Sequence, residues 1–113
     1  MALSEKGQRV LARATELIGM RENWIKGSAF RDKDGDKYGS YCAVGAVHKA
    51  AAECGYSQLG RVFDPVEQEV VLVLDWTANG SIVNLNDRPN TTHEEIKQAF
   101  CKTLKQELSN GAE

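Results

Sequence analysis

The segment from Cys42 to Cys54 constrains the fold more than any other part of this sequence, because most of its side chains are small and apolar. Ser40 can cap a helix over residues 41–53, and Gly55 can end it. Apolar residues would cover most of the circumference of that helix, which is typical of a helix buried on several sides. We therefore expect it to be the central helix, with the other elements packed around it.

Two further helices are predicted at the ends of the chain. Ser4 can cap a helix that runs to about Met20, in which apolar residues recur at three- and four-residue spacing. The capping box from Thr92 to Glu95 begins a last helix, which is expected to end near Ser109. Each helix has one apolar stripe, so each is expected to cover the core with one face.

Residues 66–77 are rich in valine and leucine, and this run suits either a buried strand or a helix. Asp64 and Pro65 before it are typical of a helix start, and Asn79-Gly80 after it is typical of a stop. These flanking signals favour the helix. Trp76 is then expected to be a core residue.

Two segments are predicted to be non-helical. Asp34-Gly35 is a strong turn signal, and aromatic residues on both sides of it favour a small β-hairpin over residues 24–41. Residues 81–90 are expected to be extended or irregular, with Asp87 in a turn. The predicted class is therefore mainly α (α+β), with about four helices around the central small-residue helix and one small hairpin.

Length and composition indicate a single globular domain over residues 1–113, with the last few residues disordered. The chain has 113 residues, of which 42% are hydrophobic and 27% charged, as in ordinary globular domains. No apolar run is long enough to span a membrane, and the N-terminus lacks the features of a signal peptide. We expect the protein in the cytoplasm of a bacterial cell or of an infected host cell. An odd number of cysteines without a Cys-x-x-Cys pair indicates reduced thiols and no disulfide.

A calcium site is suggested by carboxylates at alternate positions in Asp32-Lys33-Asp34-Gly35-Asp36. An EF-hand loop starting at Asp32 needs glycine at its sixth position and a bidentate carboxylate at its twelfth. Those positions hold Lys37 and Ala43, so both requirements fail. A solvated hairpin turn explains the segment better.

A zinc site is suggested by Cys42, His48 and Cys54, which are spaced six and six. Six residues advance a helix by about 600°, so the three side chains point in different directions and cannot converge. The sequence therefore predicts no metal site, and it contains no cofactor-binding motif.

Cys42 is the one candidate nucleophile. It is expected in the first turn of a helix, where unpaired N–H groups lower the pKa of a thiol. A catalytic pair would also need a base within hydrogen-bond reach, and His48 projects from a different side of the same helix, so His93 or a non-histidine base remains. The alternative is that Cys42 is a small buried hydrophobic residue, which is the ordinary role of a helical cysteine.

A basic, aromatic face is the candidate binding site for a nucleotide or nucleic acid, because such ligands require cations beside exposed rings. Asp32, Asp34 and Asp36 lie among these residues and would repel phosphate, and the net charge of −2 gives no general attraction to nucleic acid. A solvated face of mixed charge is the alternative. The candidate residues are Lys6, Arg9, Arg13, Trp24, Lys26, Phe30, Arg31, Lys33, Lys37 and Tyr38.

The order of several short motifs resembles a family of short uncharacterised proteins from actinobacteria, other bacteria and their phages. The resemblance runs from Leu11 to Phe100, and Leu85 departs from it, because many members have tryptophan there. It implies a bacterial or phage setting but no catalytic residues. The motifs are Trp24, Gly27, Asp34-Gly35, Cys42-Ala43-Val44-Gly45-Ala46, Ala50-Ala51, Asn86-Asp87 and Thr92-x-x-Glu95.

These observations favour a non-enzymatic binding protein that docks on another protein, as a monomer or a homodimer. If the gene belongs to a phage, inhibition or sequestration of a host system is the natural role. Binding of a nucleotide or nucleic acid through the basic face is the alternative. An enzyme that depends on Cys42 comes third.

Overall fold

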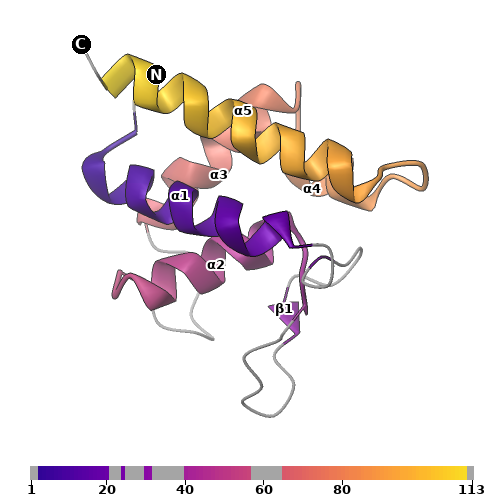
Figure 1. Cartoon of the computed structure of the whole chain (residues 1–113), viewed down its shortest axis with the longest axis horizontal. Coiled ribbons are helices and arrows are strands. Elements are labelled where there is room, and N and C mark those ends of the chain that lie inside the picture. The colour runs from indigo at the N-terminus through magenta and orange to yellow at the C-terminus, as the bar shows by residue number, and fades with distance from the viewer. Residues whose placement is uncertain (1–2, 21–23, 25–29, 32–39, 57–64, 112–113) are drawn as a thin grey trace.

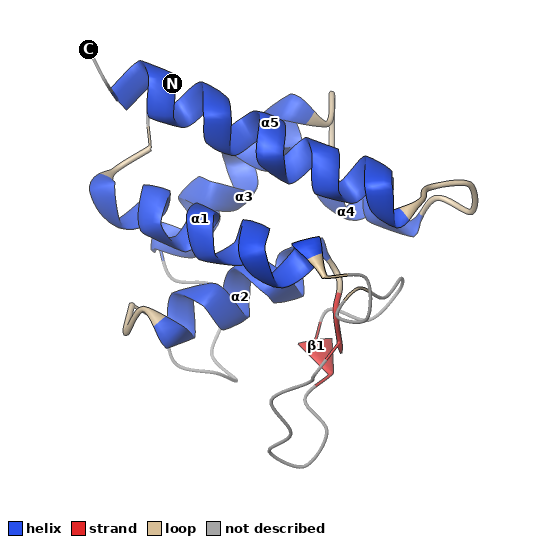
Figure 2. Ribbon diagram, in the orientation of Figure 1, coloured by secondary structure: helices blue, strands red, loops and turns tan. Residues whose placement is uncertain are grey.

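A computed structural model of the chain describes residues 3–20, 24, 30–31, 40–56 and 65–111. The prediction of a mainly helical protein is confirmed, because the described residues form five helices and one pair of two-residue strands (Figures 1 and 2). The elements are α1 (Glu5–Gly19), β1 (Phe30–Arg31), β2 (Ser40–Tyr41), α2 (Ala43–Glu53), α3 (Pro65–Thr77), α4 (Ile82–Asp87) and α5 (His93–Gly111).

Helix α1 begins and packs as its sequence predicts. The Ser4 hydroxyl accepts a hydrogen bond from the Gly7 amide at 3.0 Å, which caps the first turn. The predicted stripe faces the core, where Val10, Leu11 and Ala14 are completely buried. Figure 1 shows α1 between α2 and α5, with α3 behind them, and α1 contacts all three of these helices.

Helix α2 is buried on several sides, as predicted, but it starts two residues later than expected. Ser40 and Tyr41 pair with β1, so the helical turn can begin only after them, and Cys42 takes the N-cap position. Gly55, at φ +81°, ends the helix in the left-handed conformation that glycine adopts easily. A central position for α2 is not supported, because α1 lies between α2 and α5 in Figure 1.

Helix α3 settles the ambiguity of residues 66–77 in favour of a helix. Its core face is formed by Val70, Val73 and Leu74, which are spaced three and four residues apart. The prediction that Trp76 belongs to the core is wrong. Its side chain lies on the opposite side of the helix, and the residue is 83% exposed.

Residues 82–87 were predicted to be extended or irregular, and this prediction is also wrong, because they form helix α4. The Ser81 hydroxyl accepts a hydrogen bond from the Asn84 amide at 3.2 Å, and the Asp75 carboxylate of α3 accepts one from the Ile82 amide at 2.8 Å. These two side chains satisfy amides that a six-residue helix cannot bond internally. Asp87 is the last residue of this helix rather than a turn residue.

The structure describes only some residues of the predicted hairpin, and the hairpin as a whole stays a prediction. Phe30 lies opposite Tyr41 and Arg31 opposite Ser40 in an antiparallel pair. Residues 25–29 and 32–39 lie outside the described residues, so the Asp34-Gly35 turn stays a prediction.

Helix α5 begins at the predicted box, where the Thr92 hydroxyl accepts a hydrogen bond from the Glu95 amide at 3.2 Å. Ile96, Phe100 and Thr103 are buried against the core. The helix continues to Gly111, two residues past its expected end. Among the described residues, none of the helices combines the length and apolarity that crossing a bilayer requires.

Candidate functional site

The surface of α3 is the first candidate site, because the exposed residues of this helix are uncharged and its carboxylates are bonded to other parts of the molecule. Its exposed residues are Pro65, Gln68, Leu72 and Trp76, which we call the α3 ridge. Their spacing of three, four and four residues places them along one side of the helix. Leu72 is 58% exposed and Trp76 83%, so two large apolar side chains lie one turn apart in solvent.

The three carboxylates of α3 are each held by another part of the molecule. Glu67 is fully buried against His48 of α2. The Oε1 atom of Glu69 accepts a hydrogen bond from the Ser4 amide at 2.5 Å, and the Asp75 carboxylate accepts one from the Ile82 amide. None of the four exposed residues of α3 carries a charge, although 27% of the residues in the chain do.

The contact between His48 and Glu67 joins α2 to α3 in the interior. The His48 Nδ1 atom lies 2.8 Å from Glu67 Oε1, and the histidine side chain is only 13% exposed. The other carboxylate oxygen of Glu67, Oε2, is buried and has no hydrogen-bond partner among the described residues. A carboxylate enclosed in this way depends on the imidazole for its compensation, so we assign the pair to the stability of the α2–α3 contact.

A second candidate site forms where several motif residues meet at the start of α2. The Asn86 side-chain oxygen accepts hydrogen bonds from Trp24 Nε1 at 2.8 Å and from the Ala43 amide at 3.1 Å. Asn86 is only 1% exposed, and its amide nitrogen donates to Asp87 at 3.1 Å. One buried side chain therefore fixes both the indole and the first turn of α2.

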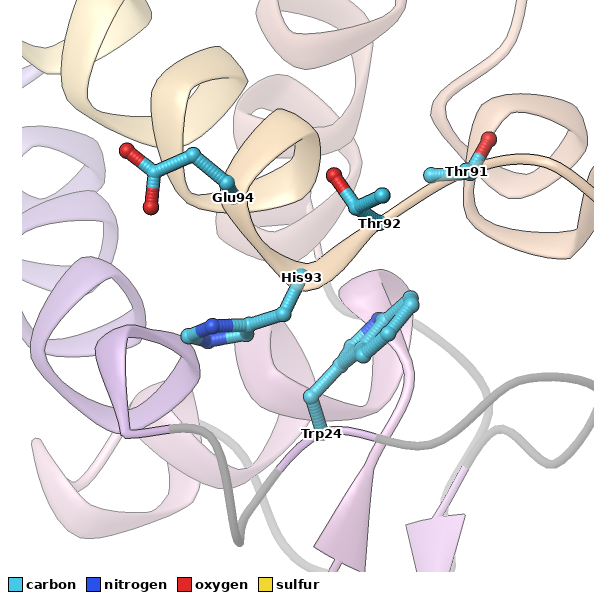
Figure 3. A pocket seen from close by; sticks show the side chains of 5 residues that line it. All are labelled: Trp24, Thr91, Thr92, His93 and Glu94. Atoms are coloured by element: carbon cyan, nitrogen blue, oxygen red, sulfur yellow. The ribbon is translucent and has the colours of Figure 1, made fainter.

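The indole of Trp24 forms one wall of a surface pocket of about 440 Å³, together with Thr91, Thr92, His93 and Glu94 (Figure 3). The rings of Trp24 and His93 lie side by side, with centroids 5.9 Å apart and planes at 44°. His93 Nε2 lies 2.7 Å from the carbonyl oxygen of Ile18 and must carry the hydrogen, because a carbonyl can only accept. The lining combines neutral groups with one carboxylate and contains no nucleophilic thiol.

Cys42 is buried at the N-cap position of α2. Its sulfur accepts a hydrogen bond from the Gly45 amide at 3.5 Å, and the residue is 7% exposed. Burial raises the pKa of the thiol, and this effect outweighs the lowering by the Gly45 and Val44 amides. The two imidazoles have other partners, Glu67 for His48 and the Ile18 carbonyl for His93. These contacts favour a buried N-cap over a nucleophile.

Two of the basic residues of α1, Lys6 and Arg9, contact Tyr56, and the two arginines of this helix, Arg9 and Arg13, are paired with carboxylates. Lys6 lies over the Tyr56 ring at 5.4 Å, and Arg9 donates to the Tyr56 hydroxyl at 3.2 Å. Arg9 also contacts Glu5 at 3.0 Å, and Arg13 contacts Glu53 at 2.9 Å. This part of the predicted basic face is therefore a mixed-charge surface.

The other members of the predicted basic face are not brought together with α1 by the described structure. Trp24 bonds to Asn86 and packs beside His93, at the other candidate site. Phe30 and Arg31 form β1, and their side chains are outside the description. Lys26, Lys33, Lys37 and Tyr38 lie outside the described residues, as do Asp32, Asp34 and Asp36. Among the described residues, no group of three His, Cys, Asp or Glu side chains could hold a metal ion.

The α3 ridge was missed from the sequence, although a signal for it is present. Once residues 66–77 are assigned to a helix, Gln68, Leu72 and Trp76 form a second stripe beside the valine stripe. In α3 only the valine stripe is buried, and Leu72 and Trp76 of the second stripe lie in solvent.

Comparison with protein families places the chain in a known group. Residues 4–106 match a family of unknown function, DUF6197, and the chain belongs to this family. The expected resemblance to an uncharacterised family is confirmed to that extent. No match was found among curated proteins or among solved structures.

Proposed function

Because membership of a family of unknown function assigns no activity, we propose a function from the surface itself: the protein is a non-enzymatic module that docks on another protein through the α3 ridge. The observation that supports this proposal is the exposure of Trp76, at 83%, beside exposed Leu72. Tryptophan is strongly enriched among the residues that dominate binding energy at protein interfaces. Fully burying a leucine side chain such as that of Leu72 contributes about 1.5–3 kcal/mol.

The alternative function, binding of a nucleotide or nucleic acid, has less support. Arg9 and Arg13 are paired with Glu5 and Glu53, so a phosphate would have to displace carboxylates from both guanidinium groups. We place the protein in the cytoplasm of a bacterial or infected cell. In a phage genome, its role would be to inhibit or sequester a host protein.

A position-specific crosslink tests the proposal. The photoreactive residue benzoylphenylalanine replaces Leu72 in the full chain, and the protein is irradiated in the cell that produces it. The matched control carries the same residue in place of Gln106, which is exposed on α5. We expect a discrete adduct from position 72 that Trp76→Ala suppresses and that position 106 does not give. Identical products from both positions would contradict docking through α3.

A further inference from the structure

The chemistry of the α3 ridge also defines the surface that it fits. We infer that the partner is a different protein that presents a concave, apolar groove without charged groups, and that α3 lies in this groove with Leu72 and Trp76 as its anchors. This inference rests on the proposed function. Recognition of a helix through apolar anchors one turn apart is a general mode of docking in a groove.

We infer an uncharged groove because the exposed residues of the α3 ridge carry no charge that could pair with a charged group of the partner. The three carboxylates of α3 are held by His48, the Ser4 amide and the Ile82 amide. A partner ammonium or carboxylate placed against Leu72 and Trp76 would lose its water and gain no opposite charge from the exposed face of α3. Such a group is unfavourable in an apolar contact, because nothing replaces the water it has lost. A groove without charge avoids this cost.

A second copy of the chain does not supply enough surface. A tryptophan buries up to about 250 Å², so Trp76 and Leu72 together offer on the order of 300 Å² per chain. Two convex ridges would then bury about 600 Å² in total, below the roughly 1,200 Å² of a specific interface. A concave groove also encloses the flanks of the helix and reaches that size. The area therefore favours a groove on another protein over a homodimer.

The test begins with the protein captured at position 72 by the crosslink, purified and mixed with the full chain. Binding is measured by calorimetry at roughly 50 mM and 500 mM NaCl, a range over which contacts between charges are strongly screened. We expect the dissociation constant to change less than about twofold between the two salts. The free chain should sediment as a monomer up to about 100 µM.

Four variants of the ridge and one control test the anchors and the absence of charge in the groove. Trp76→Ala is expected to weaken binding about 30-fold or more, and Leu72→Ala about tenfold. Trp76→Phe keeps an apolar ring and is expected to retain most of the affinity. Trp76→Lys places a charge in an uncharged groove and is expected to bind more weakly than Trp76→Ala. Gln106→Ala, a substitution of an exposed residue of α5, is the control and is expected to leave binding unchanged.

The contrary results separate this inference from the proposed function. A crosslinked adduct between two copies of the chain, together with a dimer that Trp76→Ala dissociates, would show that the partner of the ridge is a second copy of the chain. A loss of affinity of more than about tenfold at high salt, or tighter binding by Trp76→Lys, would show a charged groove. Either outcome overturns the inference and leaves docking through α3 intact. Absence of any adduct specific to position 72 overturns both.

Discussion

Helices α2 and α3 are both rich in apolar residues and pack against each other, but they differ in how many of their apolar side chains are exposed to solvent. The small side chains of α2 are buried around most of the helix, from Ala43 to Ala51. Helix α3 buries its valines and Glu67 but exposes Leu72 and Trp76. The difference shows that apolar composition alone does not predict burial. Alanine and glycine let neighbours approach from several sides, whereas a helix with larger side chains on two faces is covered on one.

The largest expected effect tests the buried contact that the two helices share. In His48→Ala, the fully buried Glu67 carboxylate loses its imidazole partner, and we expect the free energy of unfolding to fall by about 3–5 kcal/mol. Urea unfolding followed by circular dichroism measures the loss. The double variant His48→Ala/Glu67→Leu removes the buried carboxyl group as well and is expected to recover most of the stability. If the single variant is as stable as the wild type, the carboxylate is compensated in another way.

The next effect tests the enclosure of α2. Ala46 is completely buried, so Ala46→Leu forces three additional carbon atoms into a packed core and is expected to cost about 1–3 kcal/mol. Ala52→Leu is the matched control, because Ala52 lies on the same helix and is only half-buried. Thermal unfolding of both variants provides the comparison. Equal melting temperatures would mean that α2 is not enclosed.

The sequence predicts most of this fold because most helix starts are encoded locally. Ser4 and Thr92 each bond an amide three residues later, and such caps are visible in the sequence. Helix α4 was missed although Ser81 caps it locally in the same way, because it has only six residues and another of its amides is bonded by Asp75 of the preceding helix. Only the folded chain brings that carboxylate to the start of α4.

The candidate sites were less predictable, because they depend on the direction of side chains. The position of Glu67 in the first turn of α3 predicts a solvent-exposed carboxylate that stabilises the helix start. The packing of α2 against α3 instead places it in the interior beside His48. Trp76 reads as a core residue, since large aromatic residues are usually buried. Its exposure follows from the side of α3 that the core uses, which short apolar runs do not reveal.

A smaller effect concerns the thiol at the start of α2. Burial raises the pKa of Cys42 above its ordinary value of 9.0, so the folded protein holds this proton to higher pH than the unfolded chain does. The stabilisation is complete below pH 9.0 and is lost as the pH rises through the folded pKa. We expect the melting temperature of the wild type to fall more steeply above this pH than that of Cys42→Ala.

Thiol labelling checks the same burial in a different way. At neutral pH, the exposed Cys101 is expected to react quickly and Cys42 only after unfolding. Rapid labelling of Cys42 in the native protein would contradict its role as a buried cap. Such labelling would also favour the hypothesis of an enzyme that depends on the Cys42 thiol.

The smallest expected effect on stability belongs to Trp76→Ala and completes the comparison of the two helices. The Trp76 side chain lies mostly in solvent, so its removal is expected to change the free energy of unfolding by less than about 0.5 kcal/mol, in contrast to Ala46→Leu. A large apolar residue that contributes little to folding leaves its burial energy available for a partner. The measurement is urea unfolding of the wild type and the variant, with crosslinking from position 72 in the same two proteins. A variant that folds normally and loses the adduct separates binding from stability, whereas a loss of more than about 2 kcal/mol would mean that Trp76 serves the fold of α3.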